Sequence, residues 1–308
     1  MNTTPQLTLI RPFVVTDAKL ISSNVSEDDY PQWSAATTYD LAARVIVLSE
    51  HAVYESAQGS NLGNNPVNST SWIKVGPTNR WLAFDGSRAS QTKQSGSINY
   101  VIQPGQVANG LAVLNLESAS ELTVRVTSAS TGDTTPVYER SANLSPLPTA
   151  PGWWEFFYSL RQAPSQAIFL DLPSYADGIY DITLTGGSNL AVGVVILGQQ
   201  QSFASGFGVR LGARVGIQDY SRKEANEFGE RVLIERGFAR RANFNLTISE
   251  EETDYLDTVF TQVRAKPCLW IGSKKYECTT IFGIPKTFDI LINYGNHSDV
   301  ELEIEGIT

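Results

Sequence analysis

The sequence predicts a mainly β fold with three folded parts: a small aromatic β module, a central β-sandwich or jelly roll, and a C-terminal α+β domain in which one helix covers an antiparallel sheet. Short apolar segments recur between turn residues at intervals of roughly ten residues, a spacing that is typical of sandwiches. Aromatic residues are concentrated among Gly, Asn and Pro turns early in the chain, and one clear helical pattern occurs near its end.

Composition narrows the classes of partner. The chain has 308 residues, a formal net charge of -9 and 23 scattered Lys and Arg residues, whereas binding to nucleic-acid phosphates needs clustered ones. We therefore expect no nucleic-acid partner. The longest apolar run, Leu190–Leu197, is far shorter than the ~20 residues of a membrane helix, so we expect a buried strand and no membrane span. No export signal is expected at the start of the chain.

The first residues, 1–29, resemble an extended arm, because Leu7–Ile10 and Phe13–Val15 are strand-like and nearby prolines block a helix. Residues 30–76 form the predicted aromatic module. Short β segments in so few residues bury little area, so large rings must supply much of the core. The turn cluster Gly76–Asn79 predicts a domain boundary.

Residues 77–208 are the predicted sandwich. Alternation is clear at Leu122–Thr127, where apolar and polar residues point to opposite faces. The predicted strands are Ser97–Ile102, Gly110–Asn115, Glu121–Thr127, Pro136–Glu139, Trp153–Leu160, Ala167–Leu172, Gly178–Thr185 and Leu190–Leu197.

Residues 209–308 are the predicted α+β domain. Ser249 is a natural N-cap, Glu252 completes a capping box, and the apolar residues Leu256, Val259, Phe260 and Val263 share one helical face. Pro267 ends the helix, and four strand-like segments follow it. Cys268 and Cys278 flank a predicted turn at Gly272–Lys275, so a disulfide and two reduced thiols are both open; the lack of an export signal favours reduced thiols.

The sequence offers few residues for catalysis. His51 and His297 both fall in predicted polar turns without a nucleophile motif, so solvated turn residues are expected. No metal-ligand spacing is present, and we expect no catalytic residue, no metal and no cofactor. A glycosidase needs two carboxylates, and Glu155 with Asp171 is a pair that spacing leaves open, although the outer face of an apolar strand explains Glu155 better.

Exposed aromatic side chains are the remaining candidates for binding a ligand. Sugar rings pack on exposed aromatic planes beside hydrogen-bonding side chains. The candidate carbohydrate-contact residues are Trp33, Tyr39, Tyr54 and Trp72, with Gln32, Asn64 and Asn65 beside them. The alternative is that these rings are only the core of the module.

The same residues carry a family resemblance. The sequence resembles the pattern of the small chitin-binding-type carbohydrate modules at Trp33, Tyr39, Val45, Val53–Ser56, Pro66 and Trp72. The sequence departs from that pattern at Leu41–Ala43, where those modules have a Gly-Asp turn, and at Tyr54–Ser56, where they end in small residues. The resemblance implies the module's fold and, through it, contact with a cell-surface glycan.

A wider resemblance is to the tail-tip and baseplate proteins of long-tailed bacteriophages, of the distal-tail type. The segments that are similar to parts of such proteins are Pro12–Val25, Tyr30–Trp33, Gly76–Asp85 and Gln218–Ser221 through Pro267–Gly272. The resemblance implies a non-enzymatic virion structural subunit that is assembled in the host cytoplasm, that forms a homo-oligomeric ring through its arm and strand edges, and that contacts other tail proteins. The alternatives are a receptor- or polysaccharide-binding tail protein that uses residues 30–76 and, third, a glycan-degrading enzyme.

Overall fold

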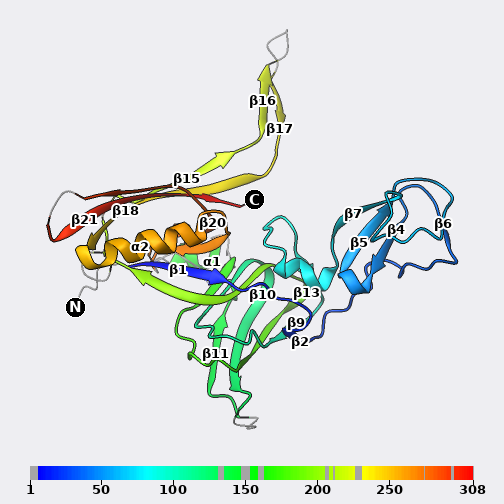
Figure 1. The fold of residues 1–308 in the computed structure, drawn as a ribbon, viewed down its shortest axis with the longest axis horizontal. Coiled ribbons are helices and arrows are strands. Elements are labelled where there is room, and N and C mark those ends of the chain that lie inside the picture. The colour runs from blue at the N-terminus through cyan, green and yellow to red at the C-terminus, as the bar shows by residue number, and fades with distance from the viewer. Residues whose placement is uncertain are drawn as a thin grey trace.

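The computed structural model describes residues 6–130, 135–146, 153–158, 163–204, 208–210, 212–225, 231–273, 275–292 and 295–307. Within these ranges the fold is mainly β, as predicted (Figure 1). An antiparallel 14-stranded sheet has the strand order β11-β10-β13-β1-β19-β20-β21-β18-β14; β8, β9, β12 and β15 pair to this path, and β2 pairs to β9. None of the described helices is long and apolar enough to cross a membrane. The division at residues 29, 76 and 208 stays a prediction.

The early elements form the aromatic module and its approach. Their bounds are β1 (Leu7–Pro12), β2 (Leu20–Ser23), β3 (Thr38–Tyr39), β4 (Arg44–Val47), η1 (Leu48–Glu50), β5 (Ala52–Ser56), β6 (Asn61–Leu62) and β7 (Trp72–Pro77). Strands β4, β5 and β7 make a three-stranded sheet, and β3 pairs with β6. Figure 1 shows this module projecting to one side of the large sheet.

The central part is built on two long strands. Its elements are η2 (Asn79–Phe84), β8 (Thr92–Lys93), β9 (Ser97–Ile102), β10 (Gly110–Ser128), β11 (Tyr138–Asn143), α1 (Trp153–Tyr158), β12 (Gln166–Phe169) and β13 (Gly178–Phe203). β10 and β13 pair along nearly their whole length, with register shifts between Glu117 and Glu121. Each therefore joins two predicted strands into one. Both halves contribute to one core, including Leu111 and Leu122 from β10, so the sheet curls around it.

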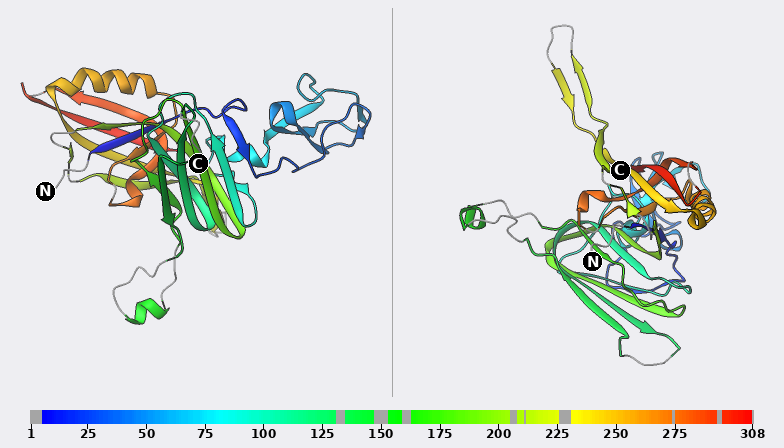
Figure 2. Two further views of the ribbon diagram at one scale, coloured as in Figure 1. Left: turned by 90° about the horizontal axis from the view of Figure 1, so that it is seen from below. Right: turned by 90° about the vertical axis from the view of Figure 1, so that its left-hand side faces the viewer.

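The prediction of a strand at Trp153–Leu160 is wrong, because Trp153–Tyr158 forms the α-helix α1. Its rings are spaced i, i+4 on two adjacent stripes: Trp153 stacks on Phe157, and Trp154 contacts Tyr158. Trp153 is 82% exposed, so the segment meets no sheet face that would favour the extended form. Figure 2 shows α1 standing away from the body of the protein.

The C-terminal part is the predicted α+β unit. Its elements are β14 (Gly208–Val209), β15 (Arg214–Asp219), β16 (Arg222–Ala225), β17 (Arg231–Ile234), β18 (Phe238–Ser249), α2 (Glu250–Val263), β19 (Cys268–Ile271), η3 (Glu277–Thr279), β20 (Thr280–Leu291) and β21 (His297–Gly306). The four apolar residues predicted on one face of α2 are buried against β18, β20 and β21. Ser249 is the N-cap residue, but its side chain makes no capping hydrogen bond.

Strand β1 is an interior strand. It pairs with β13 on one side and with β19 on the other, and Leu7, Leu9 and Ile10 are fully buried. The expectation that this part of the arm pairs with a neighbouring subunit is therefore wrong, because both of its backbone edges are occupied within the chain.

The two cysteines are both free. Cys268 is buried in β19, whereas Cys278 is exposed in η3. The reduced form is the one observed. Burial raises the pKa of the Cys268 thiol to about 11.

Candidate functional site

The aromatic residues of the module form its core. Tyr54 and Trp72 are each 6% exposed and pack with Val45 and Ala52. The indole nitrogen of Trp72 donates a hydrogen bond to the backbone oxygen of Asn64 at 2.9 Å. The Tyr39 ring meets the Trp72 ring edge-on, with 5.2 Å between centroids. These contacts fix Trp72 from two sides.

The four predicted sugar-contact residues therefore differ in what they can present. Tyr54 and Trp72 have almost no surface on which a sugar ring could stack, whereas Trp33 and Tyr39 are half-buried at the edge of the same cluster. The Tyr39 hydroxyl accepts a hydrogen bond from the Ser34 backbone at 2.8 Å. Carbohydrate contact stays a prediction, and Trp33 and Tyr39 are its accessible members.

The polar residues beside these rings are engaged in the module's loops. The Asn64 side chain donates to the Asn61 side-chain oxygen at 2.7 Å, and the Asn65 side chain accepts from the Val67 backbone at 3.0 Å. Gln32 is exposed next to Trp33. Its amide is the one best placed to meet a ligand together with that ring.

A carboxylate joins the module to the central sheet. The Glu27 side chain is only 6% exposed. It accepts hydrogen bonds from Thr78 at 2.8 Å and from Arg80 at 2.9 Å, and it contacts the His51 ring nitrogen at 3.0 Å. His51 belongs to the module, and the other two lie where the chain leaves it. One buried group thus ties the entering and leaving segments to the module.

His51 was expected to be a solvated turn residue, and this is wrong. It is half-buried at the end of η1, and its ring lies 4.4 Å from the Trp81 ring. Sequence reasoning missed Glu27 because a run of acidic residues is normally a solvated break between elements. His297 begins β21, where its ring contacts the Asn296 side chain at 2.7 Å.

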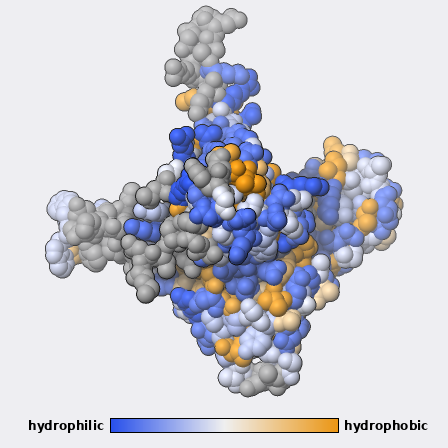
Figure 3. Space-filling model, turned by 60° about the vertical axis from the view of Figure 1, so that its left-hand side comes forward, coloured by the Kyte–Doolittle hydropathy of each residue, from blue (hydrophilic) through white to orange (hydrophobic). Residues whose placement is uncertain are grey.

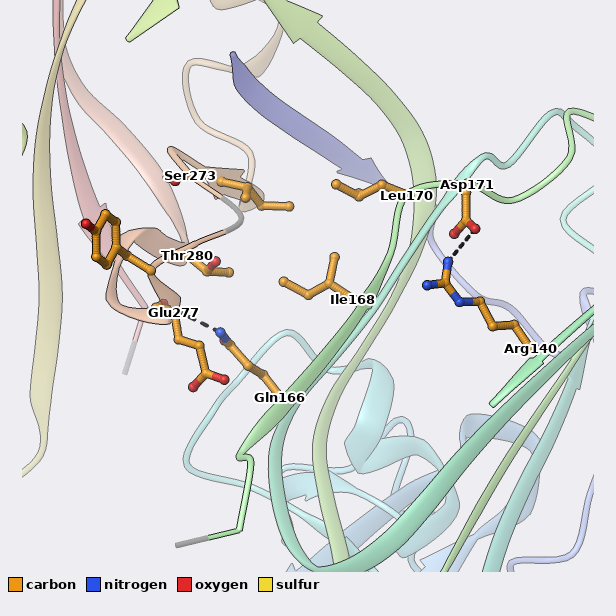
Figure 4. A pocket seen from close by; sticks show the side chains of 10 residues that line it. Arg140, Gln166, Ile168, Leu170, Asp171, Ser273, Glu277 and Thr280 are labelled. Carbon is orange, nitrogen blue, oxygen red and sulfur yellow. Dashed lines mark hydrogen bonds and ion pairs between the residues drawn. The ribbon is translucent and has the colours of Figure 1, made fainter. Parts of the chain in front are cut away.

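A cavity of about 390 Å³ lies between the central part and β19–β20. Figure 4 shows apolar Ile168 and Leu170 on its floor, with Arg140 and Asp171 joined on one side and Gln166 beside Glu277 on the other. Asp171 forms an ion pair with Arg140 and also accepts a hydrogen bond from Tyr138 at 3.1 Å.

Asp171 lines this cavity, whereas the Glu155 side chain lies outside the described part of the structure, so the glycosidase pair stays a prediction. Among the residues that the structure describes, no three His, Cys, Asp or Glu side chains gather as metal ligands.

A β-ribbon is the most exposed extended element. β15 pairs with β18 along one edge only, and Figures 1 and 2 show β16 and β17 carrying the ribbon away from the body. Ile217 on β15 is 63% exposed, and Leu233 on β17 and Phe238 on β18 are exposed as well. Elsewhere, hydrophobic residues form small groups among hydrophilic ones on the face shown in Figure 3.

Comparison with known proteins gives a partial likeness among solved structures. No protein-family model and no curated protein matches the chain. Among solved structures, the chain is similar to a chain of the tail of an empty GTA (gene-transfer-agent) particle determined with C6 symmetry. The identity is 14% and the TM-score 0.26, and the similarity covers 36% of this chain and 84% of that one.

Proposed function

We propose that this protein is a non-enzymatic structural subunit of a phage-type tail tip or baseplate, and that copies of it assemble into a symmetric ring through β-rich interfaces. The observation that carries the proposal is the ribbon of β15 to β18. Every residue of β15 except half-buried Gly216 is exposed, and its outer edge has no partner among the described strands. A strand with free backbone groups and apolar side chains such as Ile217 is a ready surface for another chain.

Charge distribution supports a contact between unlike surfaces of two copies. Asp289 on β20 and Glu301 on β21 are directly opposite in register, and no cation among the described residues pairs with either. Like charges in such positions destabilise a sheet. Arg214 and Arg241 on the ribbon likewise have no ion pair among those residues. A head-to-tail contact would bring the two sets together, and head-to-tail contacts form a ring where the rotation between copies closes.

The experiment is sedimentation velocity of the full chain, followed by electron microscopy of the oligomer. We expect a closed oligomer for the wild type and dissociation for Ile217→Asp, because a carboxylate would be buried in the contact. Val137→Asp is the matched control, since Val137 is an exposed valine beside β11 and far from the ribbon. A wild type that neither self-associates nor binds tail proteins would overturn the proposal.

A second candidate function is recognition of a receptor or surface polysaccharide by the module. Trp33, Tyr39 and exposed Gln32 favour it, because they lie together at the accessible edge of the core cluster. Trp33→Ala should then abolish retention on cell-surface glycans while the fold is kept, and unchanged retention would count against this role. In a ring, weak single contacts would add up through multivalency. The glycan-degrading alternative rests on Glu155 and Asp171, and Asp171 is already paired with Arg140.

A further inference from the structure

A second cavity, of about 250 Å³, lies where the loop after η2 meets the start of β18. Two arginines line it, Arg88 from the loop and Arg240 from β18, together with Asn115, Phe238 and Ile307. No carboxylate is part of this lining. In a chain whose net charge is -9, a pocket that gathers two cations and no anion is an exception.

Neither guanidinium has a counter-ion in the part of the chain that the structure describes. Among the described residues, no side chain forms an ion pair or hydrogen bond with the guanidinium of Arg88 or Arg240. Both residues are half-buried. Burial and, secondly, the charge of Arg240 lower the pKa of Arg88 below its ordinary value. The pair therefore carries both a desolvation cost and a mutual repulsion that an anion between them would relieve.

The chain also holds the two arginines in place. The Asn115 side chain donates a hydrogen bond to the backbone oxygen of Arg88 at 2.7 Å, and Gln91 donates to the Asn115 backbone oxygen at 3.2 Å. Asn115 has a φ of 55°, the left-handed conformation that asparagine tolerates better than most residues. Arg240 is fixed within the β15–β18 ladder, opposite Ile217. The backbone at both arginines is thus held by hydrogen bonds.

We propose that Arg88 and Arg240 form a binding site for a carboxylate, and that the carboxylate is presented by an acidic side chain of a neighbouring protein subunit. Guanidinium groups bind carboxylates through paired hydrogen bonds. Phe238, which is exposed, and Ile307 supply an apolar wall, which suits a carboxylate on an aliphatic stem more than a bare inorganic ion. The source of the carboxylate rests on the proposed assembly, whereas the anion site itself does not.

The site is tested on the full chain, under solution conditions in which sedimentation shows it to be a monomer, by NMR of the arginine Nε–Hε groups, with sodium acetate as the probe and sodium chloride at equal ionic strength as the reference. Acetate should shift the Arg88 and Arg240 signals saturably. Arg88→Gln and Arg240→Gln should each weaken acetate binding at least tenfold. Arg236→Gln, which removes an exposed arginine outside the pocket, should leave binding unchanged. Arg88→Lys should restore binding only in part, because lysine cannot form the paired hydrogen bonds.

Each outcome decides a separate point. No saturable response, or an equal response in Arg88→Gln, overturns the site and leaves the oligomer measurement to judge the proposed function. Tighter binding of phosphate or glucuronate than of acetate overturns the assignment to a protein carboxylate. If acetate binds but Arg88→Gln sediments as the same oligomer as the wild type, the neighbouring subunit is not the source. If Arg88→Gln both loses acetate and dissociates the oligomer, the proposal stands.

Discussion

Replacing Trp72 by alanine should unfold the aromatic module and leave the rest of the protein folded. Trp72 is one of four buried side chains in the module's core cluster, which is separate from the three clusters of the large sheet. Removing a buried tryptophan side chain costs about 3 to 5 kcal/mol. The hydrogen bond to Asn64 and the edge-on contact with Tyr39 are lost with it, and each is worth about 1 kcal/mol.

That cost is large for so small a unit. Whole domains are stable by only about 5 to 15 kcal/mol, and small ones lie at the lower end. Hydrogen exchange followed by mass spectrometry should therefore show loss of protection in β4 and β5 of Trp72→Ala, with protection kept in β9 and β10. Trp33→Ala is the matched control: Trp33 is only half-buried, so its module should stay protected. Wild-type protection of β5 in Trp72→Ala would refute the assignment of this ring to the core.

Three further predictions concern single groups. Glu27→Gln should cost about 3 kcal/mol, because it leaves the buried Arg80 contact uncompensated, and should let the module tumble separately in ¹⁵N relaxation; unchanged relaxation would contradict this. Cys278 should react with a thiol reagent in the native protein and Cys268 only after unfolding, so two fast-reacting thiols would refute the burial of Cys268. The pKa of Cys268 is about 11 in the folded protein, against a reference value of 9.0. Stability should therefore fall as pH rises from about 9 to about 11, and this effect should be absent in Cys268→Ala. Hydrogen bonds from Ser130 and Ser128 lower the pKa of Asp177 to about 2, so its stabilisation is present above about pH 4 and lost as pH falls toward 2; acid unfolding of Asp177→Asn should lack this step, and an unchanged acid profile would show that the bonds do not matter.

Elements with strong local signals were predictable from the sequence. The helix α2 has an N-cap residue, an amphipathic face and a terminating proline within a short span, and the structure confirms it. At α1 the aromatic residues predicted a strand, but the segment is a helix. Aromatic residues favour strands only where their side chains pack on the face of a sheet. The lengths of β10 and β13 were also beyond local reasoning, because each continues through a register shift that looks like a turn.

The candidate sites show the same limit. Trp33, Tyr39, Tyr54 and Trp72 were found from spacing, but only packing separates the buried pair from the half-buried pair. The carboxylate of Glu27 and the two arginines of the second cavity gave no signal, because each acts with residues that are distant in the chain. A lone charge in a polar stretch carries no information until the fold supplies its neighbours.

The position of β1 links folding of the chain to assembly. β1 is the first described strand, yet its partners are β13 and β19. The module and the central part are therefore both synthesised before the C-terminal sheet can close around β1. Such non-local pairing folds slowly, because loop closure must precede the contacts that stabilise it. In the ribbon, β15 and β18 belong to this large sheet, and β18 also pairs with β21, the last described strand. We therefore expect the surface proposed for assembly to become ordered only after β21 has paired.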